Sequence, residues 1–295
     1  VTVYNNGNRL GNAKDIDSNK VAQISFTNAL VIKKGTTESI VVKAKVTGTS
    51  QYALSVNAAA DLTVATGVTV SGAFPVKGNN MSGVNVTVGK LTFDNDGSLS
   101  NVKLGDKTAI LAKFKATNDN VEDIVLKSVT LKKDSSSTAA DTDFENVALY
   151  LDGAQVSAAT VVTNKYVTFK LTTPVTILKN NMKRFVVKGD VIGGASKNIM
   201  FYLDATSDIT STGSYYGYSA TVTNNLTGAT VTIDAGAVTI EKINATNTKI
   251  KKDTSDVQFG TFKVTANSGK NVELSKAKLT IVSVNDGTTD LNADG

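Results

Sequence analysis

The stretch Tyr166-Val167-Thr168-Phe169-Lys170-Leu171 alternates apolar and polar side chains with a period of two. Successive side chains of a β-strand point to opposite faces, so Val167, Phe169 and Leu171 are expected on the buried face. Tyr166, Thr168 and Lys170 are then expected on the other face. The same period recurs at Ile199, Phe201 and Leu203, at Phe185, Val187 and Val191, and at Ile40, Val42, Ala44 and Val46.

One alternating segment, residues 124–131, changes phase near Lys127-Ser128, which predicts a β-bulge. Turn sequences separate the alternating runs: Asn6-Gly7, Lys34-Gly35, Asp96-Gly97, Asp152-Gly153 and Asp286-Gly287. No long stretch has the 3.6-residue period of an amphipathic helix. The sequence therefore predicts an all-β fold of tandem immunoglobulin-like β-sandwiches with very little helix.

The chain also repeats itself at a spacing of about 145 residues. Four matches occur in the same order: Asn79-Asn80-Met81-Ser82-Gly83 with Asn224-Asn225-Leu226-Thr227-Gly228, Val41-Val42-Lys43 with Val186-Val187-Lys188, Val3-Tyr4 with Leu149-Tyr150, and Phe114-Lys115-Ala116-Thr117 with Phe262-Lys263-Val264-Thr265. Their offsets run from 145 to 148, as a few inserted loop residues would produce.

The phase of the repeat divides the chain into a late half, a complete unit and an early half. We expect the late half at residues 1–72, a connecting β arm at 73–103, the complete sandwich at 104–217, a second arm at 218–249 and the early half at 250–295. Either half alone would leave one face unburied. The parent protein could continue on both sides, the assumed phase could be wrong, or neighbouring molecules could complete the halves.

Composition excludes several kinds of chemistry. The 295 residues contain no Cys, His or Trp, so thiol and Ser-His-Asp catalysis, disulfides and thiolate zinc sites are impossible. Carboxylates at Glu122-Asp123, Asp141 and Asp143 could suggest glycoside hydrolysis, but no aromatic platform surrounds them in the sequence. We expect no enzyme.

The net charge of +5 raises the question of nucleic-acid binding. Lys and Arg are spread along the chain, as expected for solubilising side chains on strand faces, and we expect no nucleic-acid partner. No stretch reaches the roughly 20 apolar residues of a membrane helix, so no membrane insertion is expected in this segment. Residues 1–4, Val-Thr-Val-Tyr, are neither a signal peptide nor a start methionine, which places any export signal and cell-envelope attachment outside the segment.

The central unit runs through Leu111-Ala112-Lys113-Phe114-Lys115-Ala116-Thr117, Glu122-Asp123-Ile124-Val125-Leu126, Phe144-Glu145-Asn146-Val147-Ala148-Leu149-Tyr150-Leu151-Asp152-Gly153 and Arg184-Phe185-Val186-Val187-Lys188-Gly189-Asp190-Val191. This succession resembles the Ig-like repeats of bacterial surface-layer and adhesin-like proteins, notably those of the Patescibacteria. The resemblance implies export to the cell surface, formation of an array or stalk, and often calcium. It supplies no catalytic residues.

Two sequences could bind calcium. Asp290-Leu291-Asn292-Ala293-Asp294-Gly295 matches the first half of a calcium loop, with oxygen ligands expected at Asp290, Asn292 and Asp294 and the acid at position twelve lacking. Asp94-Asn95-Asp96-Gly97 offers Asp94 and Asp96, although its repeat counterpart, residues 246–248, has neither carboxylate. Acidic surface turns are the alternative in both places.

Sequons for glycosylation occur at Asn80, Asn85, Asn225 and Asn244, of which Asn80 and Asn225 are repeat equivalents. The tyrosines at 215, 216 and 218 form the one aromatic cluster, which we interpret as packing between strands.

These observations predict a structural, extracellular cell-surface protein that binds copies of itself to form a surface layer, sheath or filament. The alternative is the extended stalk of an adhesin. The accessory module of a carbohydrate-active enzyme would need an exposed aromatic strip, and the aromatic content of 6% argues against one.

Overall fold

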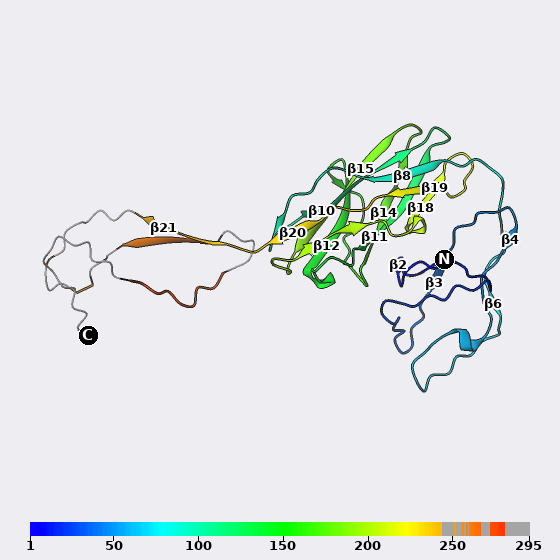
Figure 1. Cartoon of the computed structure of the whole chain (residues 1–295), viewed down its shortest axis with the longest axis horizontal. Helices are drawn as coiled ribbons and strands as arrows, with labels where there is room; N and C mark the ends of the chain where they lie inside the picture. The colour runs from blue at the N-terminus through cyan, green and yellow to red at the C-terminus, as the bar shows by residue number, and fades with distance from the viewer. Residues whose placement is uncertain (244–250, 252–254, 257, 259, 267–271, 281–295) are drawn as a thin grey trace. The chain divides into compact units, whose positions relative to one another are not determined.

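The computed structural model describes residues 1–243, 251, 255–256, 258, 260–266 and 272–280. The chain divides into two compact units, Val1–Ala235 and Gly236–Gly295, each described by itself (Figure 1). Across the described residues, the regular structure consists of strands and three single 3-10 turns, η1 (Ala59–Asp61), η2 (Asp141–Asp143) and η3 (Thr206–Asp208). The predicted all-β fold is confirmed. None of the described residues forms a helix that could span a membrane.

The first unit is built around a six-stranded sheet. Its order is β13 (Ala154–Gln155), β12 (Phe144–Leu151), β15 (Met182–Val191), β10 (Ala109–Asn118), β8 (Lys90–Asn95) and β19 (Thr221–Asn225). Neighbouring strands are antiparallel except β19 and β8, which are parallel.

A second sheet faces this one and closes the sandwich. It contains β14 (Tyr166–Ile177), β11 (Ile124–Lys133), β17 (Phe201–Tyr202) and β18 (Ile209–Gly213), the last two both pairing with β11. A smaller sheet is formed by β16 (Asn198–Ile199), β20 (Val231–Asp234) and β9 (Val102–Lys103).

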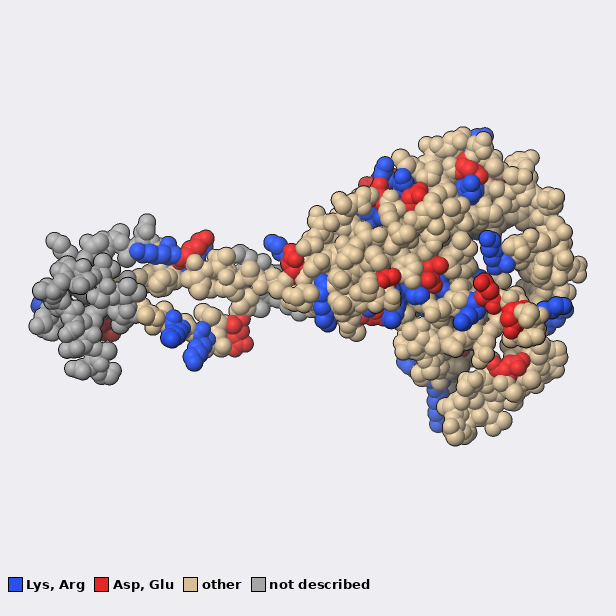
Figure 2. All heavy atoms as spheres, in the orientation of Figure 1, with Lys and Arg blue, Asp and Glu red and all other residues tan. Residues whose placement is uncertain are grey.

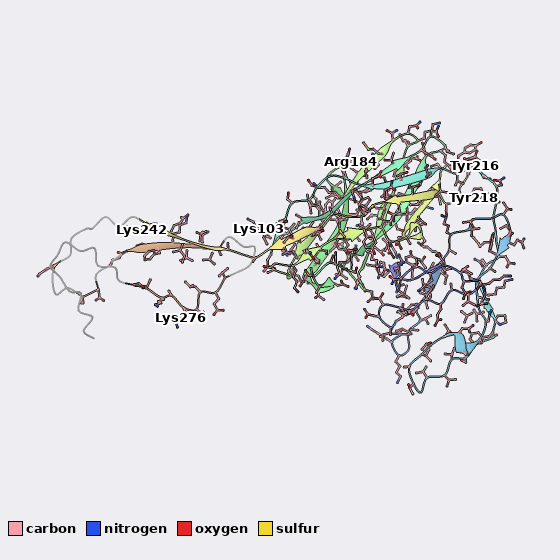
Figure 3. All side chains as sticks on the ribbon, viewed as in Figure 1. Lys103, Arg184, Tyr216, Tyr218, Lys242 and Lys276 are labelled. Atoms are coloured by element: carbon pink, nitrogen blue, oxygen red, sulfur yellow. The ribbon has the colours of Figure 1, made fainter. Side chains whose placement is uncertain are left out.

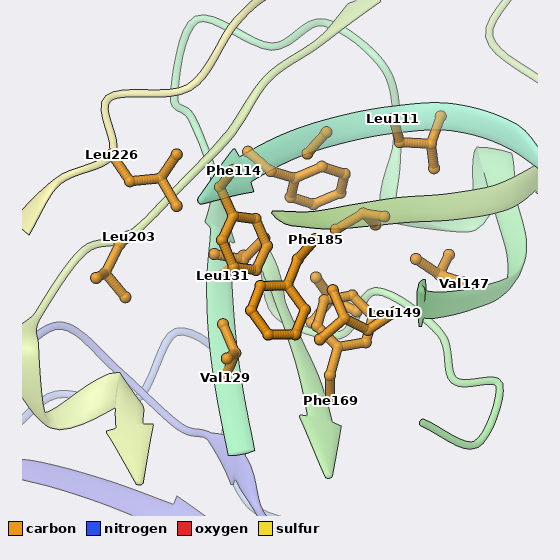
Figure 4. Packing of buried hydrophobic residues seen from close by; sticks show 14 of the residues in the cluster. Leu111, Phe114, Val129, Leu131, Val147, Leu149, Phe169, Phe185, Leu203 and Leu226 are labelled. Carbon is orange, nitrogen blue, oxygen red and sulfur yellow. The ribbon is translucent and has the colours of Figure 1, made fainter. Parts of the chain in front are cut away.

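The hydrophobic core lies between these sheets (Figure 4). Phe114 on β10 and Phe185 on β15 are opposite one another in the ladder, and their rings stack with centroids 5.2 Å apart. Phe169 on β14 and Leu131 on β11 approach from the facing sheet and are fully buried. Each such side chain contributes about 1.5–3 kcal/mol through removal of apolar surface from water.

Within the sandwich, the alternation in the sequence predicted most strand faces correctly, whereas the strand predicted through Val46 ends at Lys43 and leaves Ile40 and Val42 exposed. Val167, Phe169 and Leu171 are buried, and the pairing of β11 shifts register between Leu126 and Ser128, which confirms the predicted bulge. Tyr166 differs from the prediction: it is only 2% exposed, although it lies on the outward face of β14. The N-terminal segment covers that face and buries the ring.

The N-terminal part of the first unit has few paired strands. Its main sheet has the order β2 (Asn8–Arg9), β1 (Thr2–Asn5) and β3 (Ile40–Lys43). Two small pairs follow, β4 (Gln51–Tyr52) with β7 (Met81–Ser82) and β5 (Ser55–Val56) with β6 (Val76–Lys77).

Two hairpins of the first unit turn through Asn6-Gly7 and Asp152-Gly153, as predicted. In both dipeptides each residue has a positive φ, 49° and 86° in the first and 51° and 83° in the second. Two consecutive left-handed residues give a tight turn whose twist suits the flanking strands, and Asn, Asp and Gly adopt that conformation most readily.

The sandwich extends beyond the predicted boundaries of 104 and 217. Residues 73–103 and 218–249 were expected to be connecting arms, yet β8 and β9 come from the first and β19 and β20 from the second. Leu91, Phe93, Val231 and Ile233 are fully buried in the common core. Burial of these side chains makes the strands part of the sandwich, which runs from Lys90 to Asp234.

The second unit contains one described hairpin, β21 (Val238–Ile243) with β22 (Thr261–Ala266). Ile240, Phe262 and Val264 on this hairpin are exposed. Residues 272–280 are described without regular secondary structure, and Val272, Leu274 and Leu279 there are also exposed.

Candidate functional site

A buried arginine joins the N-terminal segment to the sandwich. Arg9 on β2 is completely buried, and its guanidinium lies 2.5 Å from the Asp208 carboxylate and 2.8 Å from that of Asp204. Its Nε donates to the carbonyl of Gly11 at 2.8 Å. Asp208 belongs to the turn η3, and Asp204 lies just before that turn. The Arg9 side chain therefore links β2 of the N-terminal segment to the turn η3 of the sandwich.

Tyr4 on β1 strengthens the same contact. Its hydroxyl donates to Asp208 Oδ1 at 2.6 Å, and the Lys43 ammonium lies 4.5 Å from the centroid of its ring. Lys43 in turn donates to Thr210 Oγ1 at 2.9 Å, and Thr2 donates to Ser207 Oγ at 3.0 Å. Asp208 therefore accepts from both Arg9 and Tyr4 and is itself almost completely buried.

A second group of side chains borders Arg9 on the sandwich side. The Arg9 guanidinium lies 4.9 Å from the centroid of the Tyr166 ring, which explains why that outward-facing tyrosine is buried. Lys132 donates to Asn12 Oδ1 at 2.7 Å and lies 3.3 Å from Asp204 Oδ1. The Tyr202 hydroxyl also donates to Asp204 Oδ1, at 3.2 Å.

Burial governs the electrostatics of this cluster. It raises the pKa of the Asp208 carboxyl, against the opposing effect of Arg9. For Arg9, burial acts against the charge, but Asp208 and the other negative groups nearby prevail and raise its pKa. Burial also raises the pKa of Tyr4 and Tyr166 and brings that of Tyr202 to about 12, so these hydroxyls stay protonated donors near neutrality.

The cluster is therefore suited to holding the N-terminal segment against the sandwich. Its charged groups are directed at one another across the contact, and a buried ion pair is costly to break because one charge is left unpaired. We call this cluster, centred on Arg9, Tyr4, Lys43 and Asp208, the junction.

The sandwich repeats the side of the junction that carries Tyr4 and Lys43. Tyr150 on β12 lies opposite Val186, as Tyr4 lies opposite Val41, and Lys188 sits 4.6 Å from the centroid of the Tyr150 ring. Gln155 on β13 takes the place of Arg9, lies opposite Tyr150 and is exposed. No part of the first unit covers Gln155, which lines a shallow hollow with Val156, Thr172 and Thr173.

The structure places only part of the predicted calcium sites. Asp290, Asn292 and Asp294 lie outside the described residues. Asp94 Oδ1 accepts a hydrogen bond from Asn225 Nδ2 at 3.0 Å, and Asp96 forms an ion pair with Arg184. The two aspartates are therefore engaged with different partners, and the described residues contain no group of three or more acidic side chains placed to hold a metal.

The interpretation of the tyrosine cluster as packing between strands is wrong. Tyr215 is 81% exposed, and Tyr216 and Tyr218, labelled in Figure 3, are also exposed. They lie in the connection between β18 and β19, and the rings of Tyr215 and Tyr216 meet edge to face with centroids 4.8 Å apart.

Glu122, one of the carboxylates considered for catalysis, instead holds that connection in place. It accepts from the backbone N–H groups of Tyr215 at 2.9 Å, Tyr216 at 3.1 Å and Gly89 at 3.2 Å. Burial opposes its charge, but the three N–H groups prevail and lower its pKa. A low pKa and three fixed donors suit a structural anchor.

Charge on the surface is mixed. On the face shown in Figure 2, Lys and Arg side chains of the first unit are interspersed with Asp and Glu, and no broad basic patch is visible there.

Sequence reasoning did not find the junction. Arg9 and Asp208 are 199 residues apart, and neither belongs to a recognisable motif. One signal was available: the chain has 31 basic residues but only two arginines, Arg9 and Arg184. Arginine is favoured over lysine where a buried fork-shaped cation is needed, so its scarcity made these positions informative.

Two solved structures show a weak likeness to the chain. A chain of the CaDoc0917–CaCohA2 complex, crystallised at pH 5.5, aligns at 10% identity over 49% of this chain and 99% of its own length, with a TM-score of 0.25. The seventh ScaB type I cohesin from Pseudobacteroides cellulosolvens aligns at 9% identity over 50% of this chain and 93% of its own, with a TM-score of 0.26. No protein-family model and no curated protein matches. TM-scores this far below 0.5 establish neither fold nor function, so the function is inferred from the chain itself.

Proposed function

We propose that this chain is a structural protein of the cell surface whose copies join head to tail, the early half-sandwich of one completing the late half-sandwich of the next. Repeated joining would build a filament, a sheath or a surface layer. The observation that carries the proposal is that both halves expose the side chains whose counterparts form the core of the complete sandwich.

The late half repeats the pairing of the complete sandwich. Val3 lies opposite Val42 and Tyr4 opposite Val41, as Leu149 lies opposite Val187 and Tyr150 opposite Val186. The isolated bridge between Gly11 and Phe26 likewise has its counterpart between Ser157 and Leu171. These pairs support treating β1, β2 and β3 as counterparts of β12, β13 and β15.

The early half repeats a different part of the sandwich. On the hairpin, Val264 lies opposite Ile240 and Thr265 opposite Thr239, as Ala116 lies opposite Phe93 and Thr117 opposite Thr92. The offset of 148 residues also relates Val272, Leu274 and Leu279 to the buried Ile124, Leu126 and Leu131 of β11. The second unit therefore supplies counterparts of β8, β10 and β11.

The two halves expose complementary apolar faces. Ile40 and Val42 on β3 are 49% and 48% exposed, whereas their counterparts Phe185 and Val187 are completely buried. Phe262 is 58% exposed, whereas its counterpart Phe114 is completely buried. Apolar side chains concentrated on one face mark an interaction site when polar residues surround them.

The complete sandwich also predicts the register in which β22 of one copy would pair with β3 of the next. In it, β10 lies between β8 and β15, with Phe114 opposite Phe185. Among the described residues, β3 pairs only with β1, which leaves its other edge open. β22 of one copy would add to this edge of β3 in the next, with Phe262 opposite Ile40. Strand addition of this kind gains both ladder hydrogen bonds and apolar burial.

A contact between two different surfaces repeats head to tail, and it gives an open filament when the rotation between copies does not close a ring. Self-association therefore follows from the geometry if the halves meet between copies. The cell-surface location and any calcium at Asp290, Asn292 and Asp294 rest on the family resemblance and remain part of the proposal.

An adhesin stalk is the alternative function, and the junction favours it. The buried Arg9–Asp208 contact fixes one half-sandwich against the following complete one within a single chain. A longer chain could complete each half internally and use such contacts to stiffen a stalk. The stalk and the assembly differ in whether purified copies associate.

Two half-blocked variants test the proposal. Phe262→Asp with Val264→Asp places charges on the early half, and Ile40→Asp with Val42→Asp places them on the late half. All four positions are exposed, so the sandwich itself should fold normally in both variants. Thr265→Asp is the matched control, because it adds a charge to the same hairpin on the face opposite to that of Phe262 and Val264.

Sedimentation velocity and light scattering then measure the size distribution. We expect the wild-type chain and the control to form a ladder of oligomers that grows with concentration. Each double variant alone should be monomeric, and an equimolar mixture should give 1:1 dimers and nothing larger. A wild-type chain that stays monomeric up to hundreds of micromolar, with no dimer in the mixture, would exclude the assembly and leave the stalk.

A further inference from the structure

The sandwich carries an uncovered version of the junction's aromatic face. The pairs Lys43–Tyr4 and Lys188–Tyr150 have nearly equal distances from ammonium to ring centroid, 4.5 and 4.6 Å, and occupy matching places on β1–β3 and β12–β15. The first pair is covered by the turn that carries Asp208. The second has no such cover in the first unit. We call the residues Tyr150, Gln155 and Lys188 the open face.

The late half carries an uncovered version of the other side of the junction. The turn η3 is held by Asp208, which accepts from the backbone N–H of Ala205 at 3.0 Å. The turn η1 is held in the same way by Asp61, whose Oδ2 accepts from Ala58 at 3.0 Å and from Asn57 at 2.9 Å. We call residues 57–61 the open turn. Asp61 is exposed, whereas Asp208 is buried against Arg9 and Tyr4.

We propose that the open face of one copy binds the open turn of the next copy, as the Tyr4–Lys43 face binds the Asp208 turn within one chain. This inference rests on the proposed head-to-tail assembly. The two surfaces would meet if the late half of the next copy follows the sandwich of the first as that sandwich follows its own late half.

The open face differs from the junction at one charged position. Gln155 stands where Arg9 stands in the junction, and within one copy its Oε1 accepts from the Tyr150 hydroxyl at 3.2 Å. The Asp61 carboxylate of the next copy would replace that acceptor and would meet the Gln155 amide and the Lys188 ammonium beside it. Without a buried arginine the contact between copies is weaker than the contact within the chain. A weaker polar contact makes the joint reversible, while the strand addition determines which modules meet.

The difference between Gln155 on the open face and Arg9 in the junction gives a test in which a substitution should strengthen the contact between copies. The dimer is formed from the two half-blocked chains, one with Ile40→Asp and Val42→Asp, which supplies the open face, and the other with Phe262→Asp and Val264→Asp, which supplies the open turn. The Kd is measured by sedimentation equilibrium. Gln155→Arg in the first chain should tighten the dimer about tenfold, the effect of one well-placed charge pair.

The gain should depend on the partner's carboxylate. With Asp61→Asn in the second chain, Gln155→Arg should change the Kd by less than about twofold, and Tyr150→Phe in the first chain should weaken the unmodified dimer severalfold. Thr176→Arg, an exposed position on the other sheet, is the control for added charge and should have no effect. Unfolding of each single chain is followed by circular dichroism to show that the sandwich is intact.

Two results would overturn the inference in distinguishable ways. A dimer that forms but is equally stable with Gln155→Arg, Tyr150→Phe and Asp61→Asn would reject the open face as the binding site and leave the strand-based assembly standing. Absence of any dimer in every mixture would reject the assembly itself, and this contact with it.

Discussion

The sandwich and the flanking segments that repeat its sequence bury their apolar side chains to different extents. Phe114 and Phe185 are stacked and inaccessible in the sandwich, while Phe262 and Ile40 at matching positions are about half exposed. The difference shows that the strand pattern alone does not produce a core. A core requires apolar side chains from two facing sheets, and among the described residues the buried cluster is drawn from Leu91 to Ile233.

The largest expected effect is a difference in the free energy of unfolding between two matched substitutions, one at Phe114 in the sandwich and one at Phe262 in the hairpin β21–β22. Phe114→Ala should lower the free energy of unfolding by about 3–5 kcal/mol, because it leaves a cavity between the sheets. Phe262→Ala should change it by less than about 0.5 kcal/mol in the monomer, since its ring is already exposed. Urea denaturation followed by tyrosine fluorescence measures both. Equal losses would mean that the half-sandwich already has a packed core.

The junction gives the next largest difference. Arg9→Leu should destabilise the contact between the N-terminal segment and the sandwich by about 3 kcal/mol, because Asp208 is left buried without its counter-ion. Gln155→Leu, the matched change on the open face, should cost less than about 0.5 kcal/mol. Limited proteolysis of residues 10–40 reports the first effect directly. A protease-resistant Arg9→Leu chain would show that the ion pair does not hold the segment.

The acid sensitivity of the sandwich should depend on Glu122. Its pKa is lowered in the folded chain, so its contribution is present above the unfolded pKa and is lost as the pH falls through the folded pKa. Glu122→Gln should cost about 1–3 kcal/mol at neutral pH and flatten the pH dependence below about pH 4.5. Thermal unfolding from pH 2 to 7 measures this. The position that matches Glu122 in the early half is Lys270, so we expect the acid effect in the sandwich alone. A pH profile that is unchanged in Glu122→Gln would contradict the role of Glu122 as the anchor of the connection between β18 and β19.

The smallest expected difference concerns the two lysine–tyrosine pairs. Lys43→Met should destabilise the first unit by about 1–2 kcal/mol, since the pair is covered and Lys43 also donates to Thr210. Lys188→Met should cost about 0.5 kcal/mol, because the same geometry is open to water. Thermal denaturation of both variants at equal concentration makes the comparison. If Lys188→Met were the more damaging change, the open face would already be engaged within the chain.

The sequence predicted the parts of this fold that depend on local pattern. Alternation identified β14, β15 and β16–β17, and a change of phase at Lys127 located the bulge in β11. The sequence assigned the stretches that hold β8, β9, β19 and β20 to connecting β arms. Their place in the sandwich could not be predicted from local pattern, because they lie in polar stretches and β19 and β20 pair with β8 and β9 over more than 100 residues.

The junction could not be predicted from the sequence for a similar reason. Tyr166 looks like an outward-facing residue until a segment more than 150 residues earlier covers it. Arg9 carries no local pattern, and only the scarcity of arginine distinguished it. Contacts between modules depend on which surfaces the fold brings together, and a single sequence read locally does not contain that information.

Amide hydrogen exchange at two protein concentrations distinguishes completion of the half-sandwiches between copies from an isolated chain, with β3 (Ile40–Lys43) and β22 (Thr261–Ala266) as the reporting segments. We expect amides of both segments to exchange quickly at low micromolar concentration and to become protected together at high concentration, while β10 stays protected throughout. Exchange in β3 and β22 that does not change with concentration would contradict completion of the half-sandwiches between copies.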